Sequence, residues 1–414
     1  MKNDRLDWMS RRALLAAGGA LFPAAAARRV FAQQAVEPVK IGVLCDMSGV
    51  YADDTGPGLL LAVQMAVRDF GNTVLGRPVA VIAADDQNKP DVGMGIARKW
   101  LDDENVQAIV CGSASSITLA AADLVRERNR ILLIAGSMSA ALTGKSCKPT
   151  SFQFGFDTYA SVRAVANAAM TAGLTSWYIV NVDYAFGHAL REDAEAFVTK
   201  AGGKFLGATS FPLNSSDLSS YLLKAQASGA KAVGLACGGS DWTNLVKQAH
   251  EFGIGRNGQT VISLASGFNE VASAGLESAQ GMMLTTPFYW DSNDGTRAFA
   301  RRFMAGHKGV APNWQQASGY SAATHYLKAV QAAGTTRGED TAKSMHRIPV
   351  KDFTVDGATI RADGQVMRPA YLARVKSPGE SRNTNDIFRI VSSITPAETW
   401  RPAAESACPL LRPL

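Results

Sequence analysis

Short apolar segments alternate with segments of helical periodicity along most of this 414-residue chain. Val39–Asp46 is a nearly unbroken apolar run, after which Leu59, Val63 and Val67 recur on one helix face. Parallel strands that are buried on both faces have this composition, and they are joined by helices of this length. The alternation therefore predicts βα units built on parallel sheets.

The alternating pattern occurs twice. The first unit has predicted strands at 39–46, 78–84, 107–111 and 131–134, and the second at 176–182, 204–211, 231–236 and 260–264. Two long helices, 296–307 and 315–332, have no strand between them and are expected to return to the first unit. The segments 370–376 and 387–394 have strand character and are assigned to the second unit.

This arrangement predicts an α/β fold with two doubly wound lobes, parallel central sheets and a hinge of three crossovers. The predicted parts are a first lobe at 38–157 plus 287–345, a second lobe at 158–286 plus 346–405, and a C-terminal tail at 406–414.

The first 32 residues have the three parts of an export signal. Arg11 and Arg12 precede an apolar run at 13–27, and a small-x-small-like cleavage site follows at 30–32. The paired arginines and the weakly apolar run favour the twin-arginine route. A membrane anchor is the alternative, but about 15 residues fall short of the roughly 20 that cross a bilayer. We therefore expect residues 1–32 to direct export.

The positive charge of the chain belongs mostly to this signal. Residues 1–32 contain six basic and two acidic residues, so they carry +4 of the formal +6 and leave +2 on the remainder. No tract of lysine and arginine with interleaved aromatic residues follows, so we expect no nucleic-acid partner. No later segment reaches 18 consecutive apolar residues, so we expect no membrane span there.

Motifs for catalysis and cofactor binding are incomplete. Gly56–Gly58 is only a fragment of the G-x-G-x-x-G fingerprint, and no G-x-x-x-x-G-K-[ST] loop is present. Gly136–Ala140 approaches a G-x-S-x-G nucleophile elbow but ends in alanine. We expect no enzyme activity, no catalytic residue and no cofactor. The histidines and cysteines are scattered without a C-x-x-C pair, so we expect no metal site.

Cys147 and Cys408 are the two cysteines best suited to a disulfide. Cys45, Cys111 and Cys237 lie in or at the end of apolar runs, where cysteine is usually a small buried hydrophobe. An oxidising compartment permits one or two disulfides. Cys147 and Cys408 lie in loop and tail sequence, so they are the preferred pair, and their bridge would hold a tail that otherwise frays.

Hydroxylated residues follow two successive strands of the first lobe. Ser115 and Ser116 lie between the third predicted strand and the next helix, and Ser137 and Ser139 follow the fourth. Ligands of open α/β sheets bind at the carboxyl ends of strands, and a helix start suits a carboxylate. Helix capping is the alternative role of Ser115, Ser116 and Ser139. We predict a ligand site at these two loops.

The second lobe offers two corresponding loops. Tyr184 and Phe186 follow its first predicted strand and could contact an apolar ligand, although Phe186 could also be a core residue. Gly238 and Asp241 follow its third predicted strand. Asp241 could meet a cationic group, or it could cap its own helix. We include all four residues in the predicted site.

Seven segments spread over nearly the whole chain after residue 32 carry a resemblance to a known family. They are 40–51 (KIGVLCDMSGVY), 86–90 (DQNKP), 142–147 (LTGKSC), 183–187 (DYAFG), 211–216 (FPLNSS), 320–326 (YSAATHY) and 408–410 (CPL). With these segments the chain resembles the substrate-binding proteins of ABC importers, specifically the branched-chain amino acid type with the type I periplasmic binding fold.

The resemblance implies a two-lobed periplasmic protein that closes on a small carboxylate-bearing solute and delivers it to a membrane permease. It implies that Ser115 contacts the ligand carboxylate and that Ser137 and Ser139 add polar contacts. It also implies that Phe186 supplies an aromatic contact and that Tyr51 faces the cleft. We expect a monomer. A ligand-sensing module for a membrane receptor is the alternative, since the same closing fold serves both roles.

The resemblance is incomplete in the second lobe. Amino acid binders of this family place an acidic residue there against the α-ammonium. Residues 265–270 offer no clear equivalent, and Glu270 is expected to begin the following helix. Without that partner, an aromatic acid would fit beside Phe186, Phe268 and Tyr51 better than an amino acid. Branched-chain or other apolar amino acids and aromatic acids both remain open as the ligand class.

Overall fold

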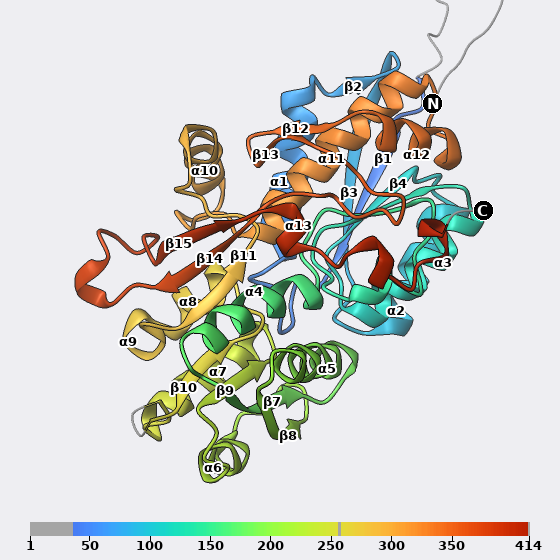
Figure 1. The fold of residues 1–414 in the computed structure, drawn as a ribbon. Helices are drawn as coiled ribbons and strands as arrows, with labels where there is room; N and C mark the ends of the chain where they lie inside the picture. The colour runs from blue at the N-terminus through green and yellow to red at the C-terminus, as the bar shows by residue number, and fades with distance from the viewer. Residues whose placement is uncertain (1–35, 256–257, 413–414) are drawn as a thin grey trace, which may run out of the picture. The chain divides into compact units, whose positions relative to one another are not determined.

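The computed structural model describes residues 36–255 and 258–412. The export signal predicted at residues 1–32 lies outside the described residues. Two mainly parallel sheets, each following the βα alternation of the sequence, dominate the fold (Figure 1). The predicted α/β class with two parallel sheets is therefore confirmed.

The first sheet has the strand order β2-β3-β1-β4-β5-β6. All its neighbouring strands pair in parallel except β2 and β3, which form an antiparallel hairpin. The strands are β1 (Val39–Cys45), β2 (Thr73–Val74), β3 (Arg77–Asp85), β4 (Ala108–Cys111), β5 (Ile131–Ile134) and β6 (Ser151–Gln153).

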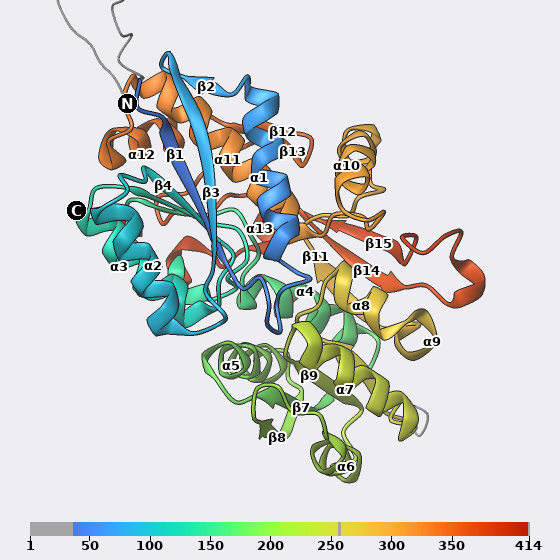
Figure 2. The same ribbon diagram turned by 180° about the vertical axis from the view of Figure 1, so that it is seen from behind.

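Helices cover both faces of the first sheet. The helices α2 (Pro90–Asp102) and α3 (Ser115–Glu127) pack on one face, and α1 (Gly56–Phe70) and α11 (Trp314–Ala333) pack on the other. Figures 1 and 2 both show α1 and α11 next to each other. Alternate residues of β4 enter the two layers, because successive strand side chains point to opposite faces. The apolar runs of the sequence are explained by this double burial.

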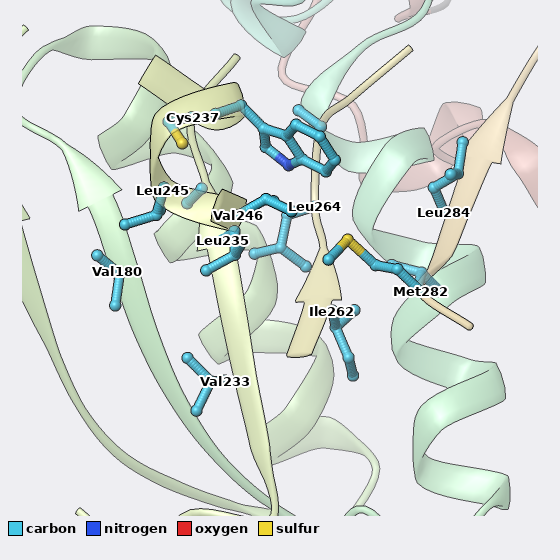
Figure 3. Packing of buried hydrophobic residues seen from close by; sticks show 14 of the residues in the cluster. Val180, Val233, Leu235, Cys237, Leu245, Val246, Ile262, Leu264, Met282 and Leu284 are labelled. Carbon is cyan, nitrogen blue, oxygen red and sulfur yellow. The ribbon is translucent and has the colours of Figure 1, made fainter. Parts of the chain in front are cut away.

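The second sheet has the order β10-β9-β7-β8 and is parallel throughout. Its strands are β7 (Ser176–Val182), β8 (Lys204–Phe211), β9 (Ala232–Ala236) and β10 (Thr260–Ser263). Its helices are α4 (Thr158–Thr171), α5 (Ala185–Lys200), α6 (Ser219–Ala227), α7 (Gly239–Glu251), α8 (Phe268–Ala274) and α9 (Leu276–Ala279). Figure 3 shows part of the core, which includes Val233 and Leu235 of β9, Ile262 of β10 and Val246 of α7.

A third, antiparallel sheet has the order β11-β14-β15. It comprises β11 (Met283–Thr286), β14 (Ala370–Val375) and β15 (Phe388–Ile394). Two of these strands are the ones that the sequence assigns to the second lobe. They do not join its parallel sheet, but Leu284, Ala373 and Phe388 pack into its hydrophobic core.

The segment between β11 and β14 returns to the first sheet. It contains α10 (Asp294–Gly306), α11, α12 (Gly338–Arg347) and the hairpin of β12 (Val350–Asp352) and β13 (Val355–Ala358). Val350, Ile360 and Val366 pack in the core of the first sheet. The returning segment therefore continues past residue 345, where the sequence places the lobe boundary. The other predicted boundaries remain predictions.

The chain ends in α13 (Pro396–Thr399) and two short 3₁₀ turns, Ala403–Glu405 and Pro409–Leu411. Cys408, at the start of the last turn, forms a disulfide with Cys147. The structure thus joins the two cysteines that loop position favours, and Cys45, Cys111 and Cys237 are free and buried.

Candidate functional site

A cavity of ≈ 520 Å³ lies where loops of the two parallel sheets meet. Loops after β1, β4 and β5 of the first sheet line it, as do loops after β7, β9 and β10 of the second and the start of α11. All six loops follow the carboxyl end of a strand, where open α/β sheets bind ligands. Concave sites at this place in the fold commonly bind small organic solutes.

Two serines of the first sheet reach this cavity. Ser115 is the first residue of α3 and is only 4% exposed. Ser137 follows β5, and its buried Oγ has no hydrogen-bond partner. The N-terminus of α3 has no side-chain cap, so its free N–H groups and positive dipole end are available at the cavity wall. This side of the cavity suits a carboxylate.

Aromatic side chains line much of the remaining wall. The hydroxyl groups of Tyr51 and Tyr184 hydrogen bond to each other and thereby join a first-sheet loop to a second-sheet loop. The rings of Tyr184 and Phe186 are 6.0 Å apart, and Trp314 lines the same cavity from the start of α11. Burial raises the pKa of both tyrosines, so their hydroxyl groups stay neutral.

Two buried acids, Asp54 and Glu270, also line the cavity. The Glu270 carboxylate accepts hydrogen bonds from the backbone N–H groups of Gly267, at 2.8 Å, and Gly239, at 3.3 Å. Asp54 hydrogen bonds to Glu270 across the cavity wall. Burial, followed by the Glu270 carboxyl, raises the pKa of Asp54 far above its usual range, and burial also raises the pKa of Glu270.

Residues 265–270 offer no clear acidic partner for an ammonium in the sequence, but in the structure Glu270 lines the cavity. Glu270 does lie in the first turn of α8, as predicted, but its side chain turns back to the helix start and into the cavity. Glu270 is the third residue of α8 and accepts the N–H of the N-cap Gly267, which is half of a capping box, but glycine lacks the side chain that would make the box recognisable in the sequence. Asp54 was also missed, although it lies in the loop directly before α1.

Hydrogen bonds to backbone carbonyl oxygens join the loop after β1 to the second-sheet helices near this part of the cavity. The backbone N–H of Ser240 donates to the carbonyl oxygen of Val50 at 3.2 Å, and the side-chain Nδ2 of Asn269 donates to the carbonyl oxygen of Asp53. Gly239 has a φ of 62°, and a Cβ there would collide with the Val50 carbonyl oxygen. Only glycine permits this approach without strain.

The structure brings six of the predicted site residues together and leaves three outside. Those that line the cavity are Tyr51, Ser115, Ser137, Tyr184, Phe186 and Gly238. Ser116 is exposed on α3, and Ser139 lines a different depression beside the C-terminal tail. Asp241 does not line the cavity, because its carboxylate turns to accept the N–H of Asn214 at 3.1 Å.

Cavity-lining residues that the sequence analysis did not identify come mostly from the same loops. They are Asp54, Thr55, Ser113, Met138, Ala265, Ser266, Glu270, Trp314 and Gln315, with Gly112, Ala114 and Gly136. Trp314 and Gln315 had no local signal, since they begin a helix that is remote in sequence from every strand of the site.

The side chains that line the cavity are suited to binding a ligand. Acids, hydroxyl groups and aromatic rings line it, and no lysine, arginine or histidine does so among the described residues. Within the same residues, no cluster of three or more histidine, cysteine or acidic side chains could hold a metal ion. None of the described helices is long and apolar enough to cross a membrane.

Comparisons with known proteins agree with one another on the class of protein that this chain is similar to. The family described as "Periplasmic binding protein" matches residues 38–381. A periplasmic binding protein from Burkholderia mallei is 37% identical, with a TM-score of 0.88 over 91% of this chain and 99% of that one. A branched-chain amino acid ABC transporter periplasmic ligand-binding protein from Burkholderia xenovorans is also 37% identical, with a TM-score of 0.82 over 90% and 100% of the chains.

A more distant solved structure shares the fold. It is an ABC transporter solute-binding protein from R. palustris in complex with benzoate, which is 18% identical. Its TM-score is 0.77, over 87% of this chain and 97% of that one. No curated protein sequence matches this chain.

Proposed function

The chain belongs to the periplasmic binding protein family, as a solute-binding protein of an ABC transporter, and on this premise we propose that it binds an apolar or aromatic α-amino acid. Members of the family are transport receptors rather than enzymes. The proposal therefore concerns which groups of the solute the cavity recognises, and the buried Glu270 carboxylate carries it.

Glu270 and Asp54 favour a ligand with an amine. Two carboxyl groups line the cavity, and no basic side chain of the described residues lines it to neutralise them. A ligand that carried only a carboxylate would bring a further negative charge into this poorly solvated space, which is costly. An ammonium group would instead supply donors for Glu270 and neutralise its charge.

The first-sheet side supports a carboxylate on the same ligand. Ser115 and the start of α3 offer donors at the cavity wall, and the unpartnered Ser137 Oγ offers another. These donors, together with the acceptors Glu270 of the second sheet and Asp54 of the loop after β1, match the two charged groups of an α-amino acid. Phe186 and Trp314 would then enclose its apolar side chain.

An aromatic acid is the second candidate. Four aromatic side chains line the cavity: Tyr51, Tyr184, Phe186 and Trp314. The raised pKa values of Asp54 and Glu270 would reduce the repulsion of an anion if one or both acids stay protonated. The two candidates differ in whether the negative charge of Glu270 helps or hinders binding.

A thermal-shift screen followed by calorimetry separates the candidates. L-Leucine and L-phenylalanine are expected to raise the melting temperature more than benzoate or 4-hydroxybenzoate, because tight binding stabilises the folded state by mass action. Glu270→Gln is expected to weaken amino acid binding by about 10–100-fold, the loss of a charged hydrogen bond. Benzoate binding that is unaffected or strengthened by Glu270→Gln, with no response to amino acids, would reverse the assignment.

From the sequence we also propose the export route of the protein and its partner in transport. The protein is exported to the periplasm by the twin-arginine route, acts there as a monomer and delivers its solute to an inner-membrane permease. Arg11 and Arg12 support the route. Replacing both with lysine should leave precursor in the cytoplasm, and unchanged export of that variant would exclude the route.

A further inference from the structure

Asp54 and Glu270 form the wall between two cavities. Both line the candidate ligand cavity, and both also line a neighbouring cavity of ≈ 560 Å³. Polar residues, among them Asp53, Thr243 and Asn269, line that second cavity. The hydrogen-bonded Asp54–Glu270 pair also joins the loop after β1 to α8, so it connects parts of the first and second sheets.

A hydrogen bond between two carboxyl groups requires a proton on one of them. Glu270 is suited to be the ionised member, because backbone N–H groups donate to both of its oxygens. Asp54 is suited to be the protonated member, because its Oδ1 is buried without a hydrogen-bond partner and the residue is only 4% exposed. The pair without ligand therefore holds one proton and one negative charge.

The other charged and titratable groups around the pair are mostly acidic or remain neutral. Asp53 and Asp46 of the loop after β1 add negative potential at Asp54. Cys237, after β9, interacts electrostatically with Glu270. Next to Cys237 lie Tyr51, Tyr184 and Asp241, from the loops after β1 and β7 and the first turn of α7, and burial keeps the tyrosines and Cys237 uncharged. His307, at the end of α10, interacts electrostatically with Asp53. No lysine or arginine lines either cavity in the described ranges.

We propose that the ammonium group of the ligand replaces the shared proton, so that binding of an amine-bearing solute releases one proton from the Asp54–Glu270 pair. This inference depends on the amino acid assignment above. The exchange is balanced: an ammonium ion enters, Asp54 gives its proton to water, and both carboxylates then accept hydrogen bonds from the ammonium. The net charge of the site with ligand ammonium bound equals its charge before binding.

The exchange follows because the carboxyl oxygens of Asp54 and Glu270 accept hydrogen bonds and the ammonium supplies more donors than the shared proton does. The ammonium carries three N–H donors, whereas a protonated Asp54 would compete with it for the Glu270 oxygens. A cation placed between two carboxyl groups also favours the ionised form of both. Asp54 would thereby make affinity depend on pH, rising by up to about tenfold per pH unit while the pair in the free protein is still protonated.

Calorimetry in two buffers tests the exchange. L-Leucine and L-phenylalanine are titrated into the wild-type protein near pH 7 in phosphate and in imidazole, whose ionisation enthalpies differ. The difference in apparent binding enthalpy between the two buffers, divided by the difference in their ionisation enthalpies, should give about one proton released per ligand. The Asp54→Asn variant should still bind the amino acid but release no proton. Asp53, the adjacent acid, lines only the second of these two cavities, so the Asp53→Asn variant should release about one proton per ligand, as the wild type does.

The outcomes separate this inference from the proposed function. Amino acid binding with no buffer dependence and with affinity independent of pH would overturn the exchange and leave the ligand assignment standing. If the Asp54→Asn variant released as many protons per ligand as the wild type, the proposed exchange would also be overturned. Binding of benzoate alone would overturn the ligand assignment and the exchange with it. The wild-type pH profile decides the matter even if Asp54→Asn does not fold.

Discussion

Ser115 and Ser116 are adjacent in the chain, yet only Ser115 lines the cavity. Successive residues of an α-helix point about 100° apart, so the two hydroxyl groups at the start of α3 face different surroundings. Ser115 is buried at the cavity wall, and Ser116 is exposed. The pair provides a matched comparison of a site residue with a neighbour of the same chemistry.

Ser115→Ala is expected to weaken binding of the preferred amino acid by about 1.5–3 kcal/mol, because it removes a hydrogen bond to a charged group. Ser116→Ala should leave the affinity unchanged within about threefold. Isothermal titration calorimetry of both variants measures the difference. Equal affinities for the two variants would remove Ser115 from the site.

The serines could be predicted from sequence, whereas the acids could not. Ser115 and Ser137 follow predicted strands at fixed offsets, so the general geometry of α/β sheets locates them. Glu270 lies in the first turn of a helix, where an acid usually serves the helix alone. Its approach to Asp54 depends on how two remote loops meet. That contact has no local signature, which is why the place of Glu270 in the cavity was missed.

At the scale of elements, the parallel strands were predictable because burial on both faces makes them continuous apolar runs. The hairpin of β12 and β13 was not, since its strands are short, and β13 contains aspartate and glycine. Segments 370–376 and 387–394 were recognised as strands, but their antiparallel pairing with β11 required knowledge of the returning chain. The helix α11 was predicted, but not its contribution to the cavity.

The start of α4 contains a buried acid that makes stability depend on pH. Asp157 is the N-cap of α4 and accepts the N–H of Ala160 at 2.7 Å. Burial raises the pKa of Asp157 to about 7, Asp193 adds to the rise, and the Ala160 N–H, Arg401 and Arg361 oppose it. Asp157 is therefore neutral in the folded protein at mildly acidic pH and ionised in the unfolded chain.

Asp157→Asn removes this titration while keeping a capping oxygen. The stabilising contribution of the neutral acid is fully present below about pH 4 and is lost as the pH rises through about 7. Wild-type stability should therefore fall relative to that of Asp157→Asn between these values, by at most about 4 kcal/mol. Urea unfolding of both proteins from pH 5 to pH 8 measures this. Parallel pH profiles would show that Asp157 is ionised in the folded state.

At the scale of the whole molecule, function depends on six strand-end loops and the start of α11 meeting around one cavity. The first sheet supplies donors for a carboxylate, and the second supplies Glu270 and aromatic rings. Loops of the first sheet also supply Asp54, so the two acids of the cavity come from different sheets. The hydroxyl contact of Tyr51 with Tyr184 and the backbone contact of Ser240 with Val50 hold these loops together in the structure.

A crystal structure of the protein with L-leucine or L-phenylalanine tests the central claim most directly. The account predicts one ligand in the cavity, with its carboxylate on Ser115, Ser137 and the first N–H groups of α3, and its ammonium on Glu270 and Asp54. A ligand bound elsewhere, or bound in the cavity without any contact from the second sheet, would contradict it.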